Sequence, residues 1–96
     1  MRLQNYEIDS IKSVTRHVFG SGAKVILFGS RVDDTLKGGD IDLYIQPSEP
    51  VSPSKKKIDF LVELKLALGD QKIDVIISRD QSRLIEQEAI KSGIKL

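Results

Sequence analysis

The chain has 96 residues and a formal net charge of +1 at pH 7, with 15 Lys and Arg against 14 Asp and Glu. This near balance gives no overall field that would attract nucleic acid or an anionic membrane, and the absence of cysteine excludes disulfides, thiolate metal sites and thiol nucleophiles. No apolar run approaches the roughly 20 residues that span a bilayer, so we expect one soluble, cytoplasmic domain over residues 1–96.

The first third of the chain predicts a helix followed by a strand. Apolar residues at spacings of three and four between residues 6 and 19 are typical of an amphipathic helix, which the Gly20-Ser21-Gly22 segment ends. In residues 24–28, Lys24 is followed by an unbroken apolar run rich in branched side chains. Such a run favours a short strand that is covered on both faces.

The second predicted strand, residues 40–45, alternates with a period of two. Its two faces differ in chemistry, with Ile41, Leu43 and Ile45 on one and Asp40, Asp42 and Tyr44 on the other. The segment that follows, residues 46–54, contains all three prolines of the chain and is expected to be an exposed connection.

The last half of the chain predicts helix, strand and helix. The apolar pattern from Ser54 indicates a helix that ends at Gly69, with the apolar positions Ile58, Leu61, Val62, Leu64, Leu66 and Leu68. Residues 72–78 alternate as a third strand, and residues 79–92 form a closing helix. This order predicts an α/β or α+β fold, with helices packed on a small mixed β-sheet.

Aspartates interrupt two of the three predicted strands, although aspartate is depleted in strands. The Cα atoms of Asp40 and Asp42 would lie about 6.7 Å apart on one face, at roughly 3.3 Å per residue, and Asp74 would join them if its strand is a neighbour. If Asp40 and Asp42 are considered without Asp74, an open, hydrated face of the strand would explain them. Three converging carboxylates repel unless a cation lies between them, and oxygen ligands select hard cations such as Mg²⁺ or Mn²⁺. The trio therefore predicts a metal site.

A second feature is Gly29-Ser30-Arg31, where the first predicted strand ends and a short helix is expected to begin. Glycine lets a phosphate approach the backbone, serine supplies a hydroxyl, and the free N–H groups at a helix start favour anions. Alone, Gly-Ser indicates only a turn. Its position nine residues before the Asp40 pair makes a phosphate-binding turn the better interpretation.

In this order, Gly29-Ser30, Gly39-Asp40-Ile41-Asp42-Leu43 and Asp74 resemble the signature of the DNA polymerase beta-type nucleotidyltransferase superfamily. More narrowly, nearly the whole chain resembles a minimal nucleotidyltransferase of the MNT kind, some of which act as antitoxins beside a HEPN-domain toxin. The resemblance implies the polymerase beta-like nucleotidyltransferase fold. It also implies transfer of a nucleoside monophosphate, expected to be AMP from ATP, although another nucleoside triphosphate would serve the same site.

The resemblance also implies residue roles. Asp40, Asp42 and Asp74 would be the catalytic carboxylates and hold Mg²⁺ (or Mn²⁺) ions, with Asp74 as the general base for an acceptor hydroxyl. Gly29 and Ser30 would hold the leaving phosphates, with Arg31 as a charge clamp. The acceptor is expected on a partner protein such as a HEPN-domain toxin, because a chain this short leaves little room for a second pocket.

Two alternatives stay open at the sequence level. The chain could be a non-catalytic antitoxin module that binds a nucleotide and a partner without turnover. A nucleic-acid polymerising domain is the less favoured alternative, because the charge pattern of the sequence does not predict the broad basic surface that such proteins use. Tyr44 and His17 are expected to be packing and surface residues respectively, and Lys55-Lys56-Lys57 a solvated run.

Overall fold

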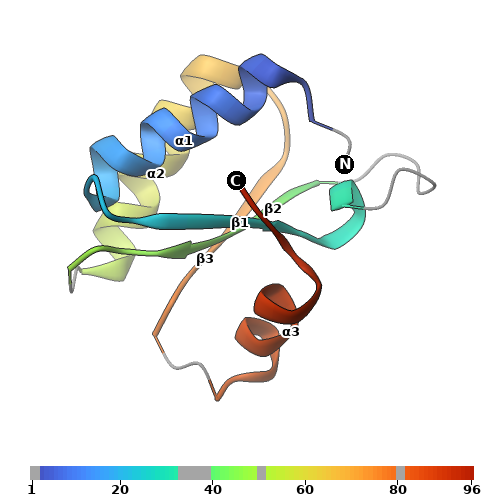
Figure 1. Cartoon of the computed structure of the whole chain (residues 1–96). Coiled ribbons are helices and arrows are strands. Elements are labelled where there is room, and N and C mark those ends of the chain that lie inside the picture. Colours follow the sequence, from blue (N-terminus) through green and yellow to red (C-terminus); the bar gives the residue numbers. More distant parts are fainter. Residues whose placement is uncertain (1–2, 33–39, 50–51, 80–81) are drawn as a thin grey trace.

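A mixed four-stranded sheet carries helices on both faces (Figure 1). The computed structural model describes residues 3–32, 40–49, 52–79 and 82–96. None of the helices in these ranges is long and apolar enough to cross a membrane. The elements in chain order are α1 (Asn5–Phe19), β1 (Lys24–Phe28), the 3-10 turn η1 (Gly29–Val32), β2 (Ile41–Gln46), α2 (Pro53–Leu68), β3 (Ile73–Ile77), α3 (Leu84–Ser92) and β4 (Ile94–Lys95).

The strands lie in the order β3-β2-β1-β4. Strand β2 pairs antiparallel with β1 and parallel with β3, and the short β4 pairs antiparallel with the outer side of β1. Helix α2 makes the crossover that a parallel β2–β3 pair requires. The mixed four-stranded sheet, with helices packed on it, confirms the predicted fold class.

Helices α1 and α2 cover one face of the sheet and form the main core with it (Figure 1). The alternation of β2 is confirmed, since Ile41, Leu43 and Ile45 are all fully buried on this face. Between the helices, the rings of Phe19 and Phe60 lie 5.5 Å apart. This packing fixes β2 in the middle of the molecule.

Helix α3 lies on the opposite face (Figure 1). It forms a smaller apolar cluster with the sheet, in which Phe28 of β1, Tyr44 of β2 and Ala89 of α3 are buried. Strand β1 is therefore covered on both faces, as its unbroken apolar run predicted. Tyr44 is a packing residue, as expected.

The main departure from the sequence pattern concerns α2. Three residues of its predicted apolar pattern are exposed. Leu64 and Leu68 are buried as predicted, together with Phe60, which the pattern did not include. The exposed residues are Ile58, Val62 and Leu66. Apolar residues occur nearly all round this helix, so their spacing alone could not show which side would face the sheet.

The C-terminal part of the chain also differs from the expectation. Helix α3 begins at Leu84 rather than at residue 79, because Arg79 still follows β3 and its backbone N–H donates to the Glu86 side chain. The two-residue strand β4 was not predicted, being too short to show an alternation. Residues 33–39 of the predicted polar connection lie outside the described residues.

Helix α2 offers a matched test of this packing. We expect Leu64→Ala to lower the free energy of unfolding by about 2–5 kcal/mol, because Leu64 is fully buried and its loss leaves a cavity. The same substitution at Leu66, which is 82% exposed, should change it by less than about 0.5 kcal/mol. Urea denaturation of both variants measures the difference, and equal losses would contradict the described orientation of α2.

Candidate active site

The parallel register of β2 and β3 places two predicted site residues opposite each other. Asp42 and Asp74 are direct partners across this pair, where neighbouring strands lie about 4.8 Å apart. Asp40 immediately precedes β2 and, two residues before Asp42, lies on the same face. The sheet therefore brings the backbone positions of all three predicted carboxylates together at one end of β2 and β3.

The turn after β1 lies against this group. Phe28, the last residue of β1, is the register partner of Asp42, and Gly29 and Ser30 open the η1 turn directly after it. Gly29 has a φ of 77°, and a Cβ at this position would overlap Oδ2 of Asp42. Glycine is thus required both by the backbone conformation and by the close approach of the turn to the carboxylate.

Like charges perturb the central carboxylate. Burial raises the pKa of Asp42, and the negative charges of Asp74 and Asp40 raise it further. Lys72 acts in the opposite direction, and its Nζ lies 3.5 Å from an Oδ2 oxygen of Asp40. The site thus already draws one cationic side chain toward its carboxylates.

The carboxylate side chains do not form a closed metal cluster. Within the described ranges, no three acidic or histidine side chains are close enough together to hold an ion as they stand. The donor chemistry nevertheless fits a hard divalent cation, because all three side chains offer oxygen ligands and a cation would relieve the repulsion that raises the pKa of Asp42. Holding an ion would require rotation of these side chains on a backbone that already aligns them.

Arg31 extends from η1 toward the segment before β3. Its Nη2 donates to Oε1 of Gln71 over 3.4 Å, and Nε2 of Gln71 donates to Oε2 of Glu7 over 2.9 Å. Glu7 is buried at the start of α1, where it also accepts from the backbone N–H of Gln4. This chain of contacts links η1 to α1 and β3. The sequence carried no spacing that pointed to Gln71.

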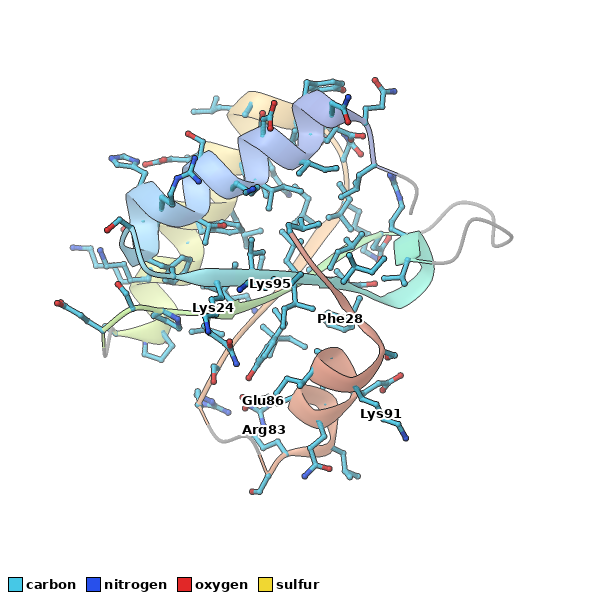
Figure 2. All side chains as sticks on the ribbon, in the orientation of Figure 1. Lys24, Phe28, Arg83, Glu86, Lys91 and Lys95 are labelled. Atoms are coloured by element: carbon cyan, nitrogen blue, oxygen red, sulfur yellow. The ribbon has the colours of Figure 1, made fainter. Side chains whose placement is uncertain are left out.

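A buried carboxylate fastens α3 to the carboxylate-bearing face of the sheet. The hydroxyl of Tyr44, two residues after Asp42, donates to Oε1 of Glu86 over 2.8 Å, and both residues are fully buried. Figure 2 labels Glu86 and Arg83 at the α3 side of this contact. Arg83 and the backbone N–H of Arg79 also donate to Glu86. Burial raises the pKa of Tyr44, and the Glu86 carboxylate adds to this rise, so the hydroxyl stays protonated and donates. Sequence reasoning missed Glu86, although its spacing of three from Ala89 places it on the buried side of α3.

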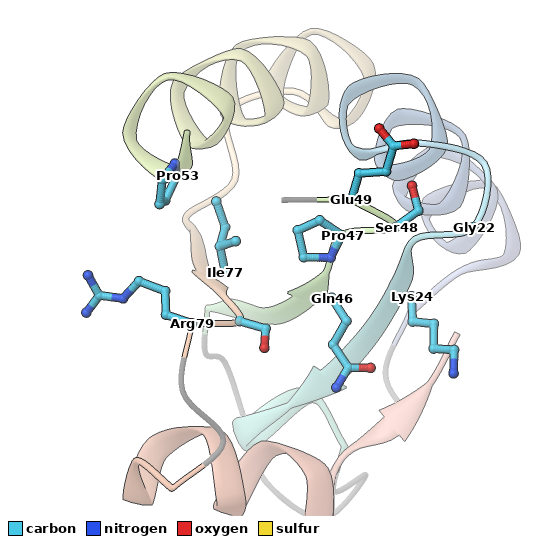
Figure 3. A pocket seen from close by; sticks show the side chains of 10 residues that line it. Gly22, Lys24, Gln46, Pro47, Ser48, Glu49, Pro53, Ile77 and Arg79 are labelled. Atoms are coloured by element: carbon cyan, nitrogen blue, oxygen red, sulfur yellow. The ribbon is translucent and has the colours of Figure 1, made fainter. Parts of the chain in front are cut away.

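A cavity lies away from the carboxylates. A pocket of about 640 Å³ is found at the opposite end of β2 and β3, lined among others by Lys24, Gln46 and Arg79 (Figure 3). None of the three predicted carboxylates lines it. The carboxylates therefore stay the predicted site, because a cation would relieve the repulsion between aligned acids.

A comparison with family models shows which family the chain belongs to. The model for "Polymerase beta, Nucleotidyltransferase" matches residues 9–96. The chain therefore belongs to the polymerase beta nucleotidyltransferase family, whose general activity is nucleotidyl transfer, and the predicted superfamily is confirmed. The curated proteins include no match to the chain.

Asp42 should make stability depend on pH. Because its pKa is raised in the folded state, ionisation of Asp42 destabilises the fold as the pH rises through the folded-state pKa. We expect Asp42→Asn to raise the melting temperature at neutral pH. In a domain of this size, a gain of about 1 kcal/mol in the free energy of unfolding raises the melting temperature by roughly 4–8 °C. The gain should vanish as the pH falls below the usual pKa range of aspartate. Asp70→Asn, at an exposed position, is the control, and the same gain in both variants would contradict the prediction.

Tyr44 provides a second test, on the attachment of α3. Tyr44→Phe should lower the free energy of unfolding by about 1–3 kcal/mol, because it removes a hydrogen bond donor from the buried Glu86 carboxylate. Tyr6→Phe is the matched control, since Tyr6 is 54% exposed, and it should leave stability unchanged. Chemical denaturation of both variants gives the comparison.

Proposed function

We propose that the protein is a Mg²⁺-dependent nucleotidyltransferase that transfers AMP from ATP to an acceptor hydroxyl. The observation that carries the proposal is the alignment of Asp42 with Asp74, beside the glycine turn that begins at Gly29. Nucleotidyl transfer is the general activity of the family. The metal, the nucleotide and the acceptor are the finer parts of the proposal.

The metal site would use Asp40, Asp42 and Asp74, with Mn²⁺ able to replace Mg²⁺ at oxygen ligands. When bound, such ions stabilise negative charge on the attacking and leaving oxygens of an in-line displacement. The raised pKa of Asp42 supports this role, because burial and the neighbouring carboxylates disfavour its charge and a bound cation would favour it. Lys72 would have to give up its contact with Asp40 or share that carboxylate.

The nucleotide would lie along η1. Gly29 offers backbone that a phosphate can approach closely, Ser30 follows it in the same turn, and Arg31 supplies a positive charge. Together they would hold the β- and γ-phosphates and orient the α-phosphate toward the carboxylates. Arg31 contacts Gln71 over 3.4 Å, and a bound phosphate would share or replace this contact.

Asp74 is the proposed general base, because it lies on the edge strand β3 and its side chain is exposed. The acceptor oxygen would form a bond to the α-phosphorus as the bond to the β-phosphate oxygen breaks, the proton passing to Asp74 and pyrophosphate leaving. An exposed base suits a hydroxyl presented by a macromolecule. We propose a cytoplasmic partner protein, and the resemblance to antitoxin nucleotidyltransferases makes a HEPN-domain toxin the specific expectation.

One observation favours a second function. The carboxylates do not form a ready metal cluster among the described residues, and Asp40 is paired with Lys72. These features would also suit a non-catalytic module that binds a nucleotide and a partner without turnover. The two functions differ in a single measurable step, the transfer of label from the nucleotide to an acceptor.

The decisive experiment incubates the protein with Mg²⁺, ATP labelled at the α-phosphate and the proteins that co-purify with it. We expect label on an acceptor and release of pyrophosphate. Asp74→Asn should reduce both by about 100-fold or more, the scale of a lost general base, and Asp42→Asn should abolish the melting-temperature rise that Mg-ATP gives the wild type.

Asp70→Asn serves as the control variant, because Asp70 is exposed and lies just before the same strand as Asp74. It should retain transfer and the response to Mg-ATP. Capture of a partner with no label in any sample would reject the enzyme in favour of the binding module. Transfer that survives in Asp74→Asn would reject the role given to that residue.

A further inference from the structure

Strand β3 has an open edge. In the parallel register with β2, the backbone N–H of Ile41 donates to the carbonyl of Lys72 and that of Ser78 donates to the carbonyl of Ile45. Even-numbered residues of β3 therefore direct their N–H and C=O groups toward β2, and Val75 and Ile77 direct theirs outward. No strand in the described ranges pairs with this outer side. The other edge of the sheet differs, since β4 pairs with β1 there.

A cationic pocket lies along the open edge. It has a volume of about 290 Å³ and is lined by the β3 residues Val75, Ile76 and Ile77 together with the start of α2. Its charged lining residues are all cationic, namely Lys57, Arg79 and Arg83. Arg83 contacts the buried Glu86, whereas Lys57 and Arg79 have no ion pair with any residue that the structure describes.

Apolar residues continue from the pocket along the adjoining side of α2. Ser54 and Lys57 line the pocket, and Ile58 and Leu61 follow them on the same side of the helix at spacings of four. Ile58 is 62% exposed, although it is a large aliphatic residue. A strand added at the β3 edge would lie next to this side of α2, and its own apolar side chains could cover Ile58.

We propose that the open edge of β3 binds an extended, acidic segment of a partner protein, which adds to the sheet as a further strand. Main-chain hydrogen bonds to Val75 and Ile77 would supply affinity, and acidic side chains that meet Lys57, Arg79 and Arg83 would supply selectivity. Charge complementarity decides the occupant. A second copy of this chain, paired edge to edge, would bring two cationic pockets together and be repelled.

The main test is residue-resolved hydrogen exchange of the whole chain with a short peptide in which Glu alternates with Val. Binding should slow exchange of the Val75 and Ile77 amides by about tenfold or more. The amides of Asp74 and Ile76 already donate to β2 and should change little. The same peptide with N-methyl groups on alternate residues should not bind, because it lacks the required donors.

Charge variants test the selectivity. The double substitution Lys57→Glu with Arg79→Glu should weaken peptide binding by about tenfold or more, since two attractive contacts become repulsive. Lys91→Glu is the matched control on the exposed side of α3 and should bind as the wild type does. Retention of the circular dichroism spectrum in the double variant separates lost binding from lost folding.

Several outcomes would overturn the proposal. Protection that does not follow the odd-numbered residues of β3 would exclude strand addition. Equal binding of a peptide with Lys in place of Glu would exclude an acidic partner. Tighter binding of a single-stranded oligonucleotide that displaces the peptide would assign the edge to nucleic acid. Dimerisation through β3 would assign it to a second copy of this chain. If the double variant aggregates and the wild type binds no peptide, the role of Lys57 and Arg79 is to prevent edge-to-edge pairing of β3. Loss of nucleotidyl transfer alone would leave this proposal intact.

Discussion

Parallel pairing of β2 with β3 determines which side chains can act together in this molecule. It sets Asp42 opposite Asp74 and leaves Asp40 two residues away on the same face. Side chains alternate along a strand, so a shift of one residue in either strand would move one carboxylate to the face covered by α1 and α2 and separate the pair. The register is thus a requirement of the candidate site as well as of the sheet.

Strand β2 is destabilised by electrostatic repulsion on one face and stabilised by burial of apolar side chains on the other. Burial raises the pKa of Asp42, and the charges of Asp74 and Asp40 add to this rise, so both effects disfavour its ionised form. Ile41, Leu43 and Ile45 are fully buried against α1 and α2, and each such side chain contributes about 1.5–3 kcal/mol. Gly29 then adds a constraint, since its turn lies against Asp42 with no room for a side chain. The apolar face is what holds the acidic face in place.

The parts of this architecture that follow a strict period could be predicted from the sequence. The alternation of β2 and β3 correctly assigned the buried and polar faces, and the order of Gly29, Asp40, Asp42 and Asp74 pointed to the family. Helix α2 could not be oriented, because apolar residues surround it. Contacts between distant segments, such as Arg31 with Gln71 or Tyr44 with Glu86, depend on tertiary placement that no local spacing encodes. The roles of the carboxylates in chemistry stay predictions.

The unequal size of the two apolar clusters has a consequence for motion. Helices α1 and α2 share an extended core with the sheet, whereas α3 is held by the small cluster around Phe28 and Ala89 and by the hydrogen bonds of Glu86. Segments with few buried apolar contacts open at lower free energy than the whole molecule. Partial unfolding should therefore begin with α3 and β4, and it would uncover the face that carries the carboxylates while the remainder of the sheet stays folded.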